Sequence, residues 1–515
     1  TEEFVINTPF RGAWKDYLGN AAVHGQAATV FAQLITGGIN YGVHCFFVPI
    51  RTEAGEMLPG VQSEDDGVKG GLNGIDNGRL AFDHVRIPRE NLLNRYGDVA
   101  PDGSYSSPID SPGRRFFTML GALVQGRVSL DGSATTASAL GLYIALTYAG
   151  QRRQFDDGAG AGETKLLDYG LHQRRLLPLL AQTYAQAFAH DELLVKFDGV
   201  FSGKNDTPDE REDLETLAAA LKPLSTWHAL DTLQECREAC GGQGFLAENR
   251  LVGLHADLDV YATFEGDNHI LLQLVGKRLL GDYAKQLKGK DARALAAFAV
   301  GQTAGKAFHG AGLRRLGQAF ADFGSPARSV ENGLRADQQH ALLADRVQQM
   351  VADVAMAMRP AQKAAPAEAS AIFNRNQHQL IEAARAHGEL LQWEAFTDAV
   401  NRTEDADTKQ VLGWLRDLFG LTLIERHLAW HIINGRLSTQ RAATLSRYID
   451  RLCLRLRPHA QDLVDAWAFA PEHVRAPIAS GIEETRQQEA RSYYAEQAAS
   501  GTAPKSEKAL NKKKR

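Results

Sequence analysis

The strongest constraint on the fold is a change in the character of the sequence near residue 114. Residues 1–100 contain short runs of β-branched and aromatic residues, such as VHCFFVPI and LAFDHVRIP, between Gly-rich turns. These runs predict short antiparallel strands, and their regular spacing favours a small barrel or sandwich. Residues 101–113 are rich in Pro, Gly and Ser and predict a connection to the helical part that follows.

The helical part is predicted to form two domains. Residues 114–284 place apolar and small residues at helical spacing, which predicts a bundle of four closely packed helices. Residues 285–494 are amphipathic and rich in Ala, Leu, Arg and Gln, which predicts a C-terminal helical domain. Residues 495–515 have the composition of a disordered basic tail. The predicted fold class is therefore α+β, mostly α.

Composition narrows the classes of function. The formal net charge of -5 gives no reason to expect nucleic acid as a partner, and no apolar run is long enough to cross a bilayer. Four cysteines in 515 residues indicate a reducing compartment. Cys236 and Cys240 have no second Cys/His pair with zinc-ligand spacing, so buried thiols are favoured over a metal site.

The two ends of the sequence lead to further expectations. The chain begins with Thr and opens directly into a strand-like run, so we expect that an upstream segment is missing. It ends in NKKKR, without a peroxisomal signal of the Ser-Lys-Leu type. On that basis we predict a cytoplasmic location in a bacterium.

The segment YATFEGDNHILLQLVG at 261–276 carries the strongest chemical signal. Glu265 lies among aromatic and apolar residues, where a carboxylate loses solvation and can act as a base near neutral pH. Gly266 lets a backbone or a ligand approach closely, and Asp267 with Asn268 can cap the helix predicted to follow. Alternatively, Glu265 is only a carboxylate favoured by the N-terminus of that helix.

Two arginines lie on the first long helix. Arg127 and Arg152 are 25 residues apart, about seven helical turns, which places them on nearly the same side. A guanidinium suits an anionic group because it can form two parallel hydrogen bonds. The alternative for each arginine is a solvated surface position.

Two glycine-containing clusters complete the candidate site. CREACGGQGF ends the third predicted helix, and the absence of side chains at Gly241 and Gly242 lets a cofactor approach backbone N–H groups. In the β-region, KDYLGN offers Tyr17 as a flat aromatic ring, the backbone N–H of Gly19, and Asn20. The alternatives are an ordinary helix C-cap and a polar hairpin with an aromatic plug.

Together these segments resemble the acyl-CoA oxidases, the longer relatives of the acyl-CoA dehydrogenases. EGDN at 265–268 resembles their catalytic-base motif, YAGQRRQF at 148–155 their Y-A-x-x-R-x-x-F signature, and CREACGGQGF at 236–245 their C-R-x-x-C-G-G-x-G segment. KDYLGN at 15–20 resembles their K-x-W-I-[ST]-N segment, although Tyr replaces the Trp and Gly replaces the hydroxyl residue.

The resemblance implies FAD-dependent α,β-desaturation of a fatty acyl-CoA to a trans-2-enoyl-CoA, with 114–284 as the FAD-binding bundle. Glu265 would take the α-proton while FAD takes the β-hydride. Arg127 and Gly266 would bind the substrate. The implied cofactor-binding residues are Tyr17, Gly19, Asn20, Arg152, Gly241, Gly242 and Asn268.

The resemblance leaves the electron acceptor open. In an oxidase, O2 reoxidises the flavin and gives H2O2, whereas in a dehydrogenase an electron-transferring flavoprotein does so. It also implies a homodimer, because the family's FAD site borrows residues from the partner. The family further has an N-terminal helical domain, and we expect it to be missing here either because the chain is a fragment or because the protein begins upstream. A non-catalytic helical scaffold derived from the same fold is a second hypothesis, from another class of function.

Overall fold

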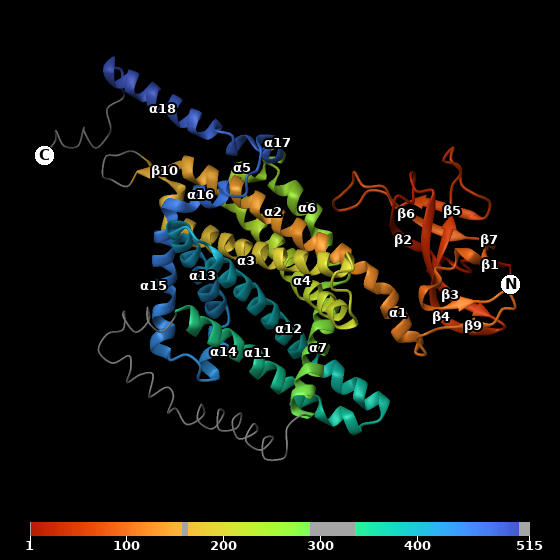
Figure 1. Cartoon of the computed structure of the whole chain (residues 1–515). Helices are drawn as coiled ribbons and strands as arrows, with labels where there is room; N and C mark the ends of the chain where they lie inside the picture. Colours follow the sequence, from red (N-terminus) through yellow and green to blue (C-terminus); the bar gives the residue numbers. More distant parts are fainter. Residues whose placement is uncertain (1, 157–162, 289–334, 504–515) are drawn as a thin grey trace. The chain divides into compact units, whose positions relative to one another are not determined.

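The computed structural model describes residues 2–156, 163–288 and 335–503 (Figure 1). The chain divides into two compact units, Thr1–Gly126 and Arg127–Arg515, and each unit has its own core. This boundary lies beyond the connection predicted at 101–113. The reason is that α1 (Pro112–Leu120) belongs to the first unit, where it packs on β4 (Ile39–Pro49).

The first unit is built from small antiparallel sheets. Besides β4, its described strands are β1 (Glu3–Ile6), β2 (Lys15–Gly19), β3 (Ala27–Thr36), β5 (Val61–Asp65), β6 (Asn77–Phe82), β7 (Val85–Pro88), β8 (Asp98–Val99) and β9 (Tyr105–Ser106). The sheets pair β3 with β4, β1 with β7 and β8 with β9, and β2, β6 and β5 form a three-stranded sheet. Apolar side chains such as Phe46, Val48 and Leu80 form the core. Across the described strands the sheets do not close into a barrel, so the predicted barrel or sandwich is an open set of small sheets.

The second unit is almost entirely helical. Its longer helices are α2 (Val124–Gln151), α3 (Gly170–Phe201), α4 (Pro208–Ala239), α7 (Asn268–Lys288), α11 (Ala336–Met358), α12 (Pro366–Arg402), α13 (Ala406–Arg426), α15 (Thr439–Leu456) and α18 (Ile482–Ala499). The shorter ones are α5 (Gly242–Phe245), α6 (Leu251–Asp259), α14 (Leu428–Ile433), α16 (Ala460–Asp465) and α17 (Pro471–Val474). β10 (Arg153–Asp156) and β11 (Glu163–Lys165) pair as an antiparallel ribbon. No described helix has both the length and the apolar character that crossing a bilayer requires.

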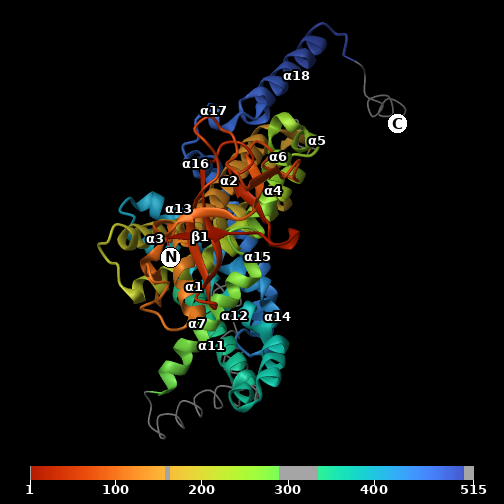
Figure 2. The ribbon, with the colours of Figure 1, turned by 90° about the vertical axis from the view of Figure 1, so that its right-hand side faces the viewer.

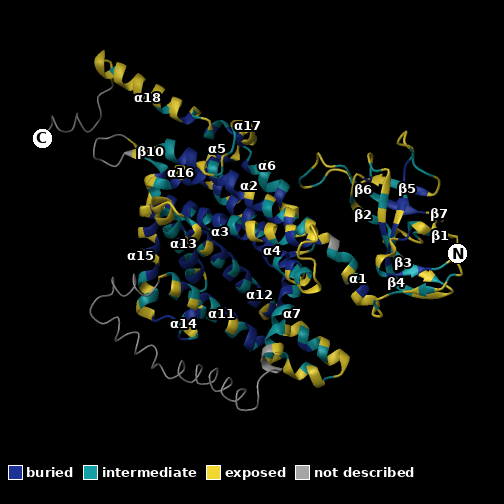
Figure 3. Cartoon of the chain, in the orientation of Figure 1, coloured by how far each residue is buried: buried dark blue, intermediate teal, exposed yellow. Residues whose placement is uncertain are grey.

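One hydrophobic core joins the two helical domains that the sequence predicts as separate. Leu177 of α3, Leu233 of α4, Phe396 of α12 and Phe419 of α13 belong to the same buried cluster. The physical reason is that α12 packs directly on α3, α4 and α7, so the C-terminal helices cover the bundle. Figure 3 shows the buried residues concentrated along α3, α4 and α12.

Small residues allow the helices of the second unit to approach closely. A Cβ at Gly141 of α2 would lie 2.8 Å from Leu233 Cδ2 of α4, and one at Gly388 of α12 would lie 2.7 Å from Leu224 Cδ1 of α4. At both distances the leucine would have to shift to make room for a methyl group. The close packing predicted from the Ala, Ser and Gly content of the first long helix is therefore confirmed at Gly141.

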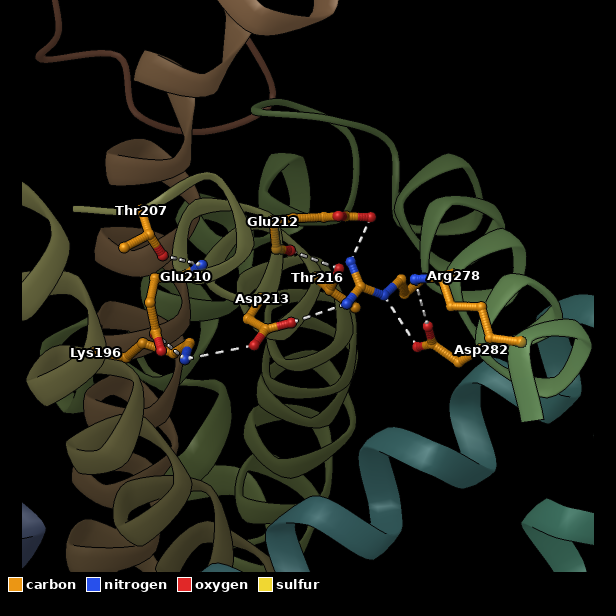
Figure 4. Close-up of polar contacts among 9 residues, drawn as sticks. Lys196, Thr207, Glu210, Glu212, Asp213, Thr216, Arg278 and Asp282 are labelled. Carbon is orange, nitrogen blue, oxygen red and sulfur yellow. Dashed lines mark hydrogen bonds and ion pairs between the residues drawn. The ribbon is translucent and has the colours of Figure 1, made fainter. Parts of the chain in front are cut away.

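The ends of α4 follow from local sequence. Its N-cap Thr207 accepts the N–H of Glu210, with Pro208 at the first helical position (Figure 4). The helix ends at Ala239, and Gly241 takes φ +57° just beyond it. The predicted stop at GGQGF is confirmed, because glycine is the residue that adopts this conformation without strain.

The last described helix corrects one prediction. α18 continues to Ala499, whereas the sequence predicts disorder from residue 495. Ala, Glu, Gln and Arg are strong helix formers, so the composition of this stretch also favours a helix. In Figures 1 and 2, α18 projects from the rest of the helical unit, and Figure 3 shows it as largely exposed. Residues 504–515 of the predicted tail lie outside the described residues.

Candidate active site

Glu265 lies in a turn, residues 263–267, that connects η7 (Val260–Ala262) to α7. Glu265 has φ +55° and Gly266 has φ +101°, so two successive residues adopt positive backbone angles. A non-glycine residue in this region costs about 1–3 kcal/mol and persists only where its surroundings hold it. The next residue, Asp267, caps α7 as predicted, because its Oδ1 accepts two N–H groups from the first turn of the helix.

Glu265 is an exposed residue. Tyr261 and Phe264 contact each other, with ring centroids 5.0 Å apart. The desolvation predicted from the aromatic neighbours in the sequence is therefore not found among the described residues. What the structure provides instead is an accessible carboxylate on a fixed turn.

Lys222 of α4 fixes this turn, and the sequence analysis missed it. Its side chain is fully buried, and Nζ donates to the carbonyls of Phe264 at 3.0 Å and Gly266 at 2.8 Å. Burial lowers the pKa of Lys222 to about 8, although the charges of Asp267 and Glu265 oppose the shift. The available signal was a lysine within the apolar run AAALKPL, where a charged residue needs a specific partner.

Asn268, predicted to bind the cofactor, is committed to the protein interior. Its side chain is 1% exposed. Oδ1 accepts from Lys222 Nζ at 3.0 Å, and Nδ2 donates to Thr226 Oγ1 at 3.0 Å. Asn268 therefore links α7 to α4, and it has no exposed polar group to offer a ligand.

Arg127, predicted to bind the substrate, lies against the Glu265 turn. Its Nε donates to the carbonyl oxygen of Glu265 at 3.3 Å. Burial lowers the pKa of the Arg127 guanidinium, and the charges of Glu215 and Glu265 oppose that shift. Gly266, also predicted to bind the substrate, is required by the packing, since a Cβ there would lie 2.9 Å from Leu271 Cδ2.

Gly241 and Gly242 lie at the end of α4, as predicted. No atom stands within 4 Å of the position that a Cβ would take at either glycine, so the backbone is open to approach. Cys236 and Cys240 on the preceding turn are both buried, as predicted. Burial raises the pKa of the Cys240 thiol to about 12, so the thiol stays neutral at ordinary pH.

Arg152 follows the last residue of α2, at the other end of that helix from Arg127. The 25 residues between them span about 37 Å of helix, so the two guanidinium groups serve separate places. Arg152 Nη1 forms an ion pair with Glu483 of α18 at 3.1 Å. The Arg152 side chain nevertheless remains 41% exposed, whereas that of Glu483 is 2% exposed.

The predicted cofactor residues of the β unit lie along β2 and the turn after it. Tyr17 and Asn20 have φ values of +58° and +63°, and Tyr17 is 74% exposed. Gly19 and Asn20 line a cavity of about 370 Å³, together with Thr29 and Phe31. The side chain of Gly19 is hydrogen only, and nothing lies within 4 Å of where a Cβ would stand.

The structure thus brings together Glu265, Gly266, Arg127 and Asn268, with Lys222 at their centre. Gly241, Gly242 and Arg152 occupy other places in the same helical unit, and Tyr17, Gly19 and Asn20 lie in the β unit.

Comparisons with known proteins identify the chain. Residues 120–280 match the family described as acyl-CoA oxidase, C-alpha1 domain, and residues 336–481 match the acyl-CoA oxidase family. Acyl-coenzyme A oxidase 3, peroxisomal, of Arabidopsis thaliana is 37% identical over 485 residues, which cover 93% of this chain and 67% of that protein.

Solved structures show the same likeness. Acyl-CoA oxidase 1 from Yarrowia lipolytica has a TM-score of 0.80 and 28% identity, covering 98% of this chain and 72% of that one. Acyl-CoA oxidase-1 of Caenorhabditis elegans, complexed with FAD and ATP, shares the fold with a TM-score of 0.77 and 24% identity, covering 96% of this chain and 70% of that one.

Fold, family matches and relatives together define an oxidoreductase that acts on CH–CH groups. The chain belongs to the acyl-CoA oxidase family.

The relatives contradict the predicted location. Three relatives from Arabidopsis thaliana are named as peroxisomal proteins, which overturns the prediction of a bacterial cytoplasmic enzyme. That prediction relied on the last residues of the printed sequence, and a single short signal at one end is too little to decide the compartment.

Proposed function

We propose that this chain desaturates fatty acyl-CoA at the α,β position, with FAD as cofactor and O2 as the final electron acceptor. Fatty acyl-CoA oxidation is supported by the family to which the chain belongs. For this chain, the observation that carries the proposal is the Glu265 turn, residues 263–267. It presents an exposed carboxylate from a backbone that Lys222 and Arg127 hold in a strained conformation.

In the proposed reaction, Glu265 accepts the α-proton next to the thioester carbonyl. Loss of one proton and one hydride converts CH2–CH2 into CH=CH. The two electrons end on O2, which takes up two protons and becomes H2O2. Arg127 donates a hydrogen bond from Nε to the Glu265 carbonyl oxygen. Its two terminal nitrogens are proposed to contact the substrate.

The residues present fit a flavin dinucleotide. When bound, FAD supplies the hydride acceptor. Gly241 and Gly242 leave room for it at the backbone, and Gly19 with Asn20 lines a cavity in the β unit. The Arg152 guanidinium keeps an exposed face for a diphosphate beside its ion pair with Glu483. The FAD complex of the Caenorhabditis elegans oxidase, which shares this fold, supports the same cofactor.

The proposal includes a homodimer and O2 as acceptor. Arg152 is expected to contact the diphosphate across a subunit interface, as the family resemblance implies. The relatives named above are oxidases, which favours O2 over an electron-transferring flavoprotein.

The test is a visible spectrum of the full chain, reconstituted with FAD under anaerobic conditions. Addition of a mid-chain acyl-CoA is expected to bleach the flavin band, and admission of air to restore it with one H2O2 per turnover. Bleaching that persists in air would contradict the oxidase assignment. Absence of a flavin band after reconstitution would contradict FAD as the cofactor.

A matched pair of variants tests the role of Glu265. Glu265→Gln is expected to keep its flavin and to lose bleaching by about 10³-fold or more, because the reaction loses its base. Glu248→Gln changes another exposed carboxylate of the same unit and is expected to react like the wild type. Equal rates for the two variants would exclude Glu265 as the base.

A further inference from the structure

Three successive carbonyls of the Glu265 turn are bound by two cations. Lys222 Nζ takes those of Phe264 and Gly266, at 3.0 and 2.8 Å, and Arg127 Nε takes that of Glu265 at 3.3 Å. The bonds from Lys222 thus lie on both sides of Glu265. The peptide group before Glu265 is held by Lys222 and the one after it by Arg127, and the second bond from Lys222 holds the peptide group after Gly266. Together these bonds fix the backbone around the residue with the strained φ of +55°.

All three N–H donors of the Lys222 ammonium are used in and beside this turn. The third is accepted by Asn268 Oδ1 at 3.0 Å, at the start of α7. An ammonium has three N–H groups, so its hydrogen-bonding capacity is filled. None of the three acceptors is a carboxylate, and a buried charge whose bonded partners are all neutral is costly. A neutral side chain could join α4 to α7 at less cost, so the charge itself calls for an explanation.

We propose that Lys222 is a positioning residue for Glu265: it fixes the turn so that the carboxylate points outward at the reacting carbon. This inference rests on the proposed function, in which Glu265 is the base. Lys222 itself touches neither substrate nor cofactor, and it acts through the backbone of the turn. The alternative is a purely structural role, in which Lys222 only joins α4 to α7.

A second ion cluster joins the same two helices away from the turn and provides a control. Arg278 of α7 contacts Glu212 and donates to Asp213 of α4 at 3.1 Å and to Asp282 at 3.0 Å (Figure 4). Lys196 of α3 donates to Glu210 of the same stretch of α4 at 2.7 Å. Removing Arg278 is expected to weaken the packing of α4 on α7 and to leave the carbonyls of the turn bound.

The experiment compares Lys222→Met with Arg278→Met in the full chain. The first readout, on protein without FAD or substrate, is hydrogen–deuterium exchange of peptides covering 260–271. Lys222→Met is expected to speed exchange there at least tenfold, because Lys222 binds the carbonyls of both Phe264 and Gly266. Arg278→Met is expected to lower the melting temperature and leave exchange of the turn as in the wild type.

The second readout is the rate of anaerobic flavin bleaching by acyl-CoA and by its α-deuterated form. Lys222→Met is expected to lower the rate about 100-fold, with a smaller change in KM, because a misplaced base loses its geometry for proton transfer. Its isotope effect is expected to rise, since proton removal becomes the slow step. Lys222→Gln retains two N–H donors and is expected to lie between the wild type and Lys222→Met.

The outcomes separate the two proposals. A wild type that bleaches with acyl-CoA, with Lys222 variants that lose only melting temperature, would overturn the positioning role. The same holds if Lys222→Met does not fold and Lys222→Gln keeps the wild-type rate and isotope effect. A wild type that never bleaches, or a Glu265→Gln variant that bleaches normally, would overturn the proposed function instead. In that case the exchange readout still shows whether Lys222 holds the turn.

Discussion

Two turns that carry candidate functional residues, one in each unit, are held by a buried cation. In the β unit, Arg51 is 7% exposed, and its guanidinium donates to three carbonyls in residues 21–25 at 2.6–2.8 Å, just after Gly19 and Asn20. In the helical unit, Lys222 is fully buried and donates to two carbonyls of the Glu265 turn. The same chemistry thus appears twice: a cation replaces the hydrogen bonds that an irregular backbone cannot make for itself.

The two turns differ in what holds their N–H groups and in which cation they use. Asp76 accepts three successive N–H groups from residues 22–24, so the β-unit turn is bound on both sides. Its cation, a guanidinium, stays charged at all ordinary pH values. The Glu265 turn is bound chiefly at its carbonyls, and its cation has a pKa of about 8. We infer that the first turn is a permanent part of the fold, whereas the second depends on pH.

The largest effect is expected from Arg51→Met. Three buried carbonyls would lose their donor, and each unsatisfied acceptor costs about 1 kcal/mol or more, so we expect the β unit to lose about 3 kcal/mol or more. Hydrogen exchange of the peptides from β3 and β4, measured against urea concentration, gives this free energy. Arg86→Met is the control, since Arg86 only pairs with Glu3 at the surface. If both variants retain wild-type protection, Arg51 does not hold the turn.

Gly266→Ala is expected to cost less, about 2 kcal/mol, in the helical unit. An alanine at φ +101° is strained, and its Cβ would lie 2.9 Å from Leu271 Cδ2. The measurement is the urea midpoint of the full chain followed by far-UV circular dichroism. Gly253→Ala, in α6 with no atom within 4 Å of the new Cβ, is the matched control and is expected to be neutral or slightly stabilising. Equal midpoints for the two variants would show that the turn relaxes freely.

These turns also show what the sequence could and could not predict. The helical spacing, the cap at Asp267 and the helix stop before Gly241 depend on neighbours within a few residues, and all three were predicted. Lys222 and Arg51 act on carbonyls that are 26 or more residues away in the sequence, and no periodicity carries that information. Burial of Glu265 was wrongly predicted for the same reason. Aromatic neighbours in the sequence do not decide which side chains cover a carboxylate.

A third prediction concerns pH. The pKa of Lys222 is about 8 in the folded chain and has its ordinary value of 10.5 when unfolded. Below pH 8 both states hold the proton, so Lys222 adds no pH dependence. Between pH 8 and 10.5 the unfolded chain binds more protons, so the free energy of unfolding rises with pH, by about 1 kcal/mol from pH 8 to 9.

The measurement is the difference in the free energy of unfolding between the wild type and Lys222→Met, taken at pH 7, 8 and 9. Other titrating groups cancel in this difference. The same difference for Arg51→Met is expected to stay flat over this range, because the guanidinium does not titrate there. If the difference in the free energy of unfolding does not change with pH for either variant, the Glu265 turn is no more dependent on pH than the turn held by Arg51.

The smallest effect on stability is expected from Gly19→Ala. Gly19 has an ordinary φ and open space where the Cβ would stand, unlike Gly266, so the free energy of unfolding should change by no more than about 0.5 kcal/mol. If the flavin approaches the backbone there, the added methyl group takes up that space, and the affinity for FAD should fall about tenfold, or 1.4 kcal/mol. Titration of FAD fluorescence and urea unfolding measure the two quantities on the same protein. A variant that loses stability together with affinity would place Gly19 in the same class as Gly266, as a residue the backbone requires. A variant that loses affinity for FAD alone would show that Gly19 serves the ligand and not the stability of the fold. Gly19 would then differ from Gly266, which the packing of its own turn requires.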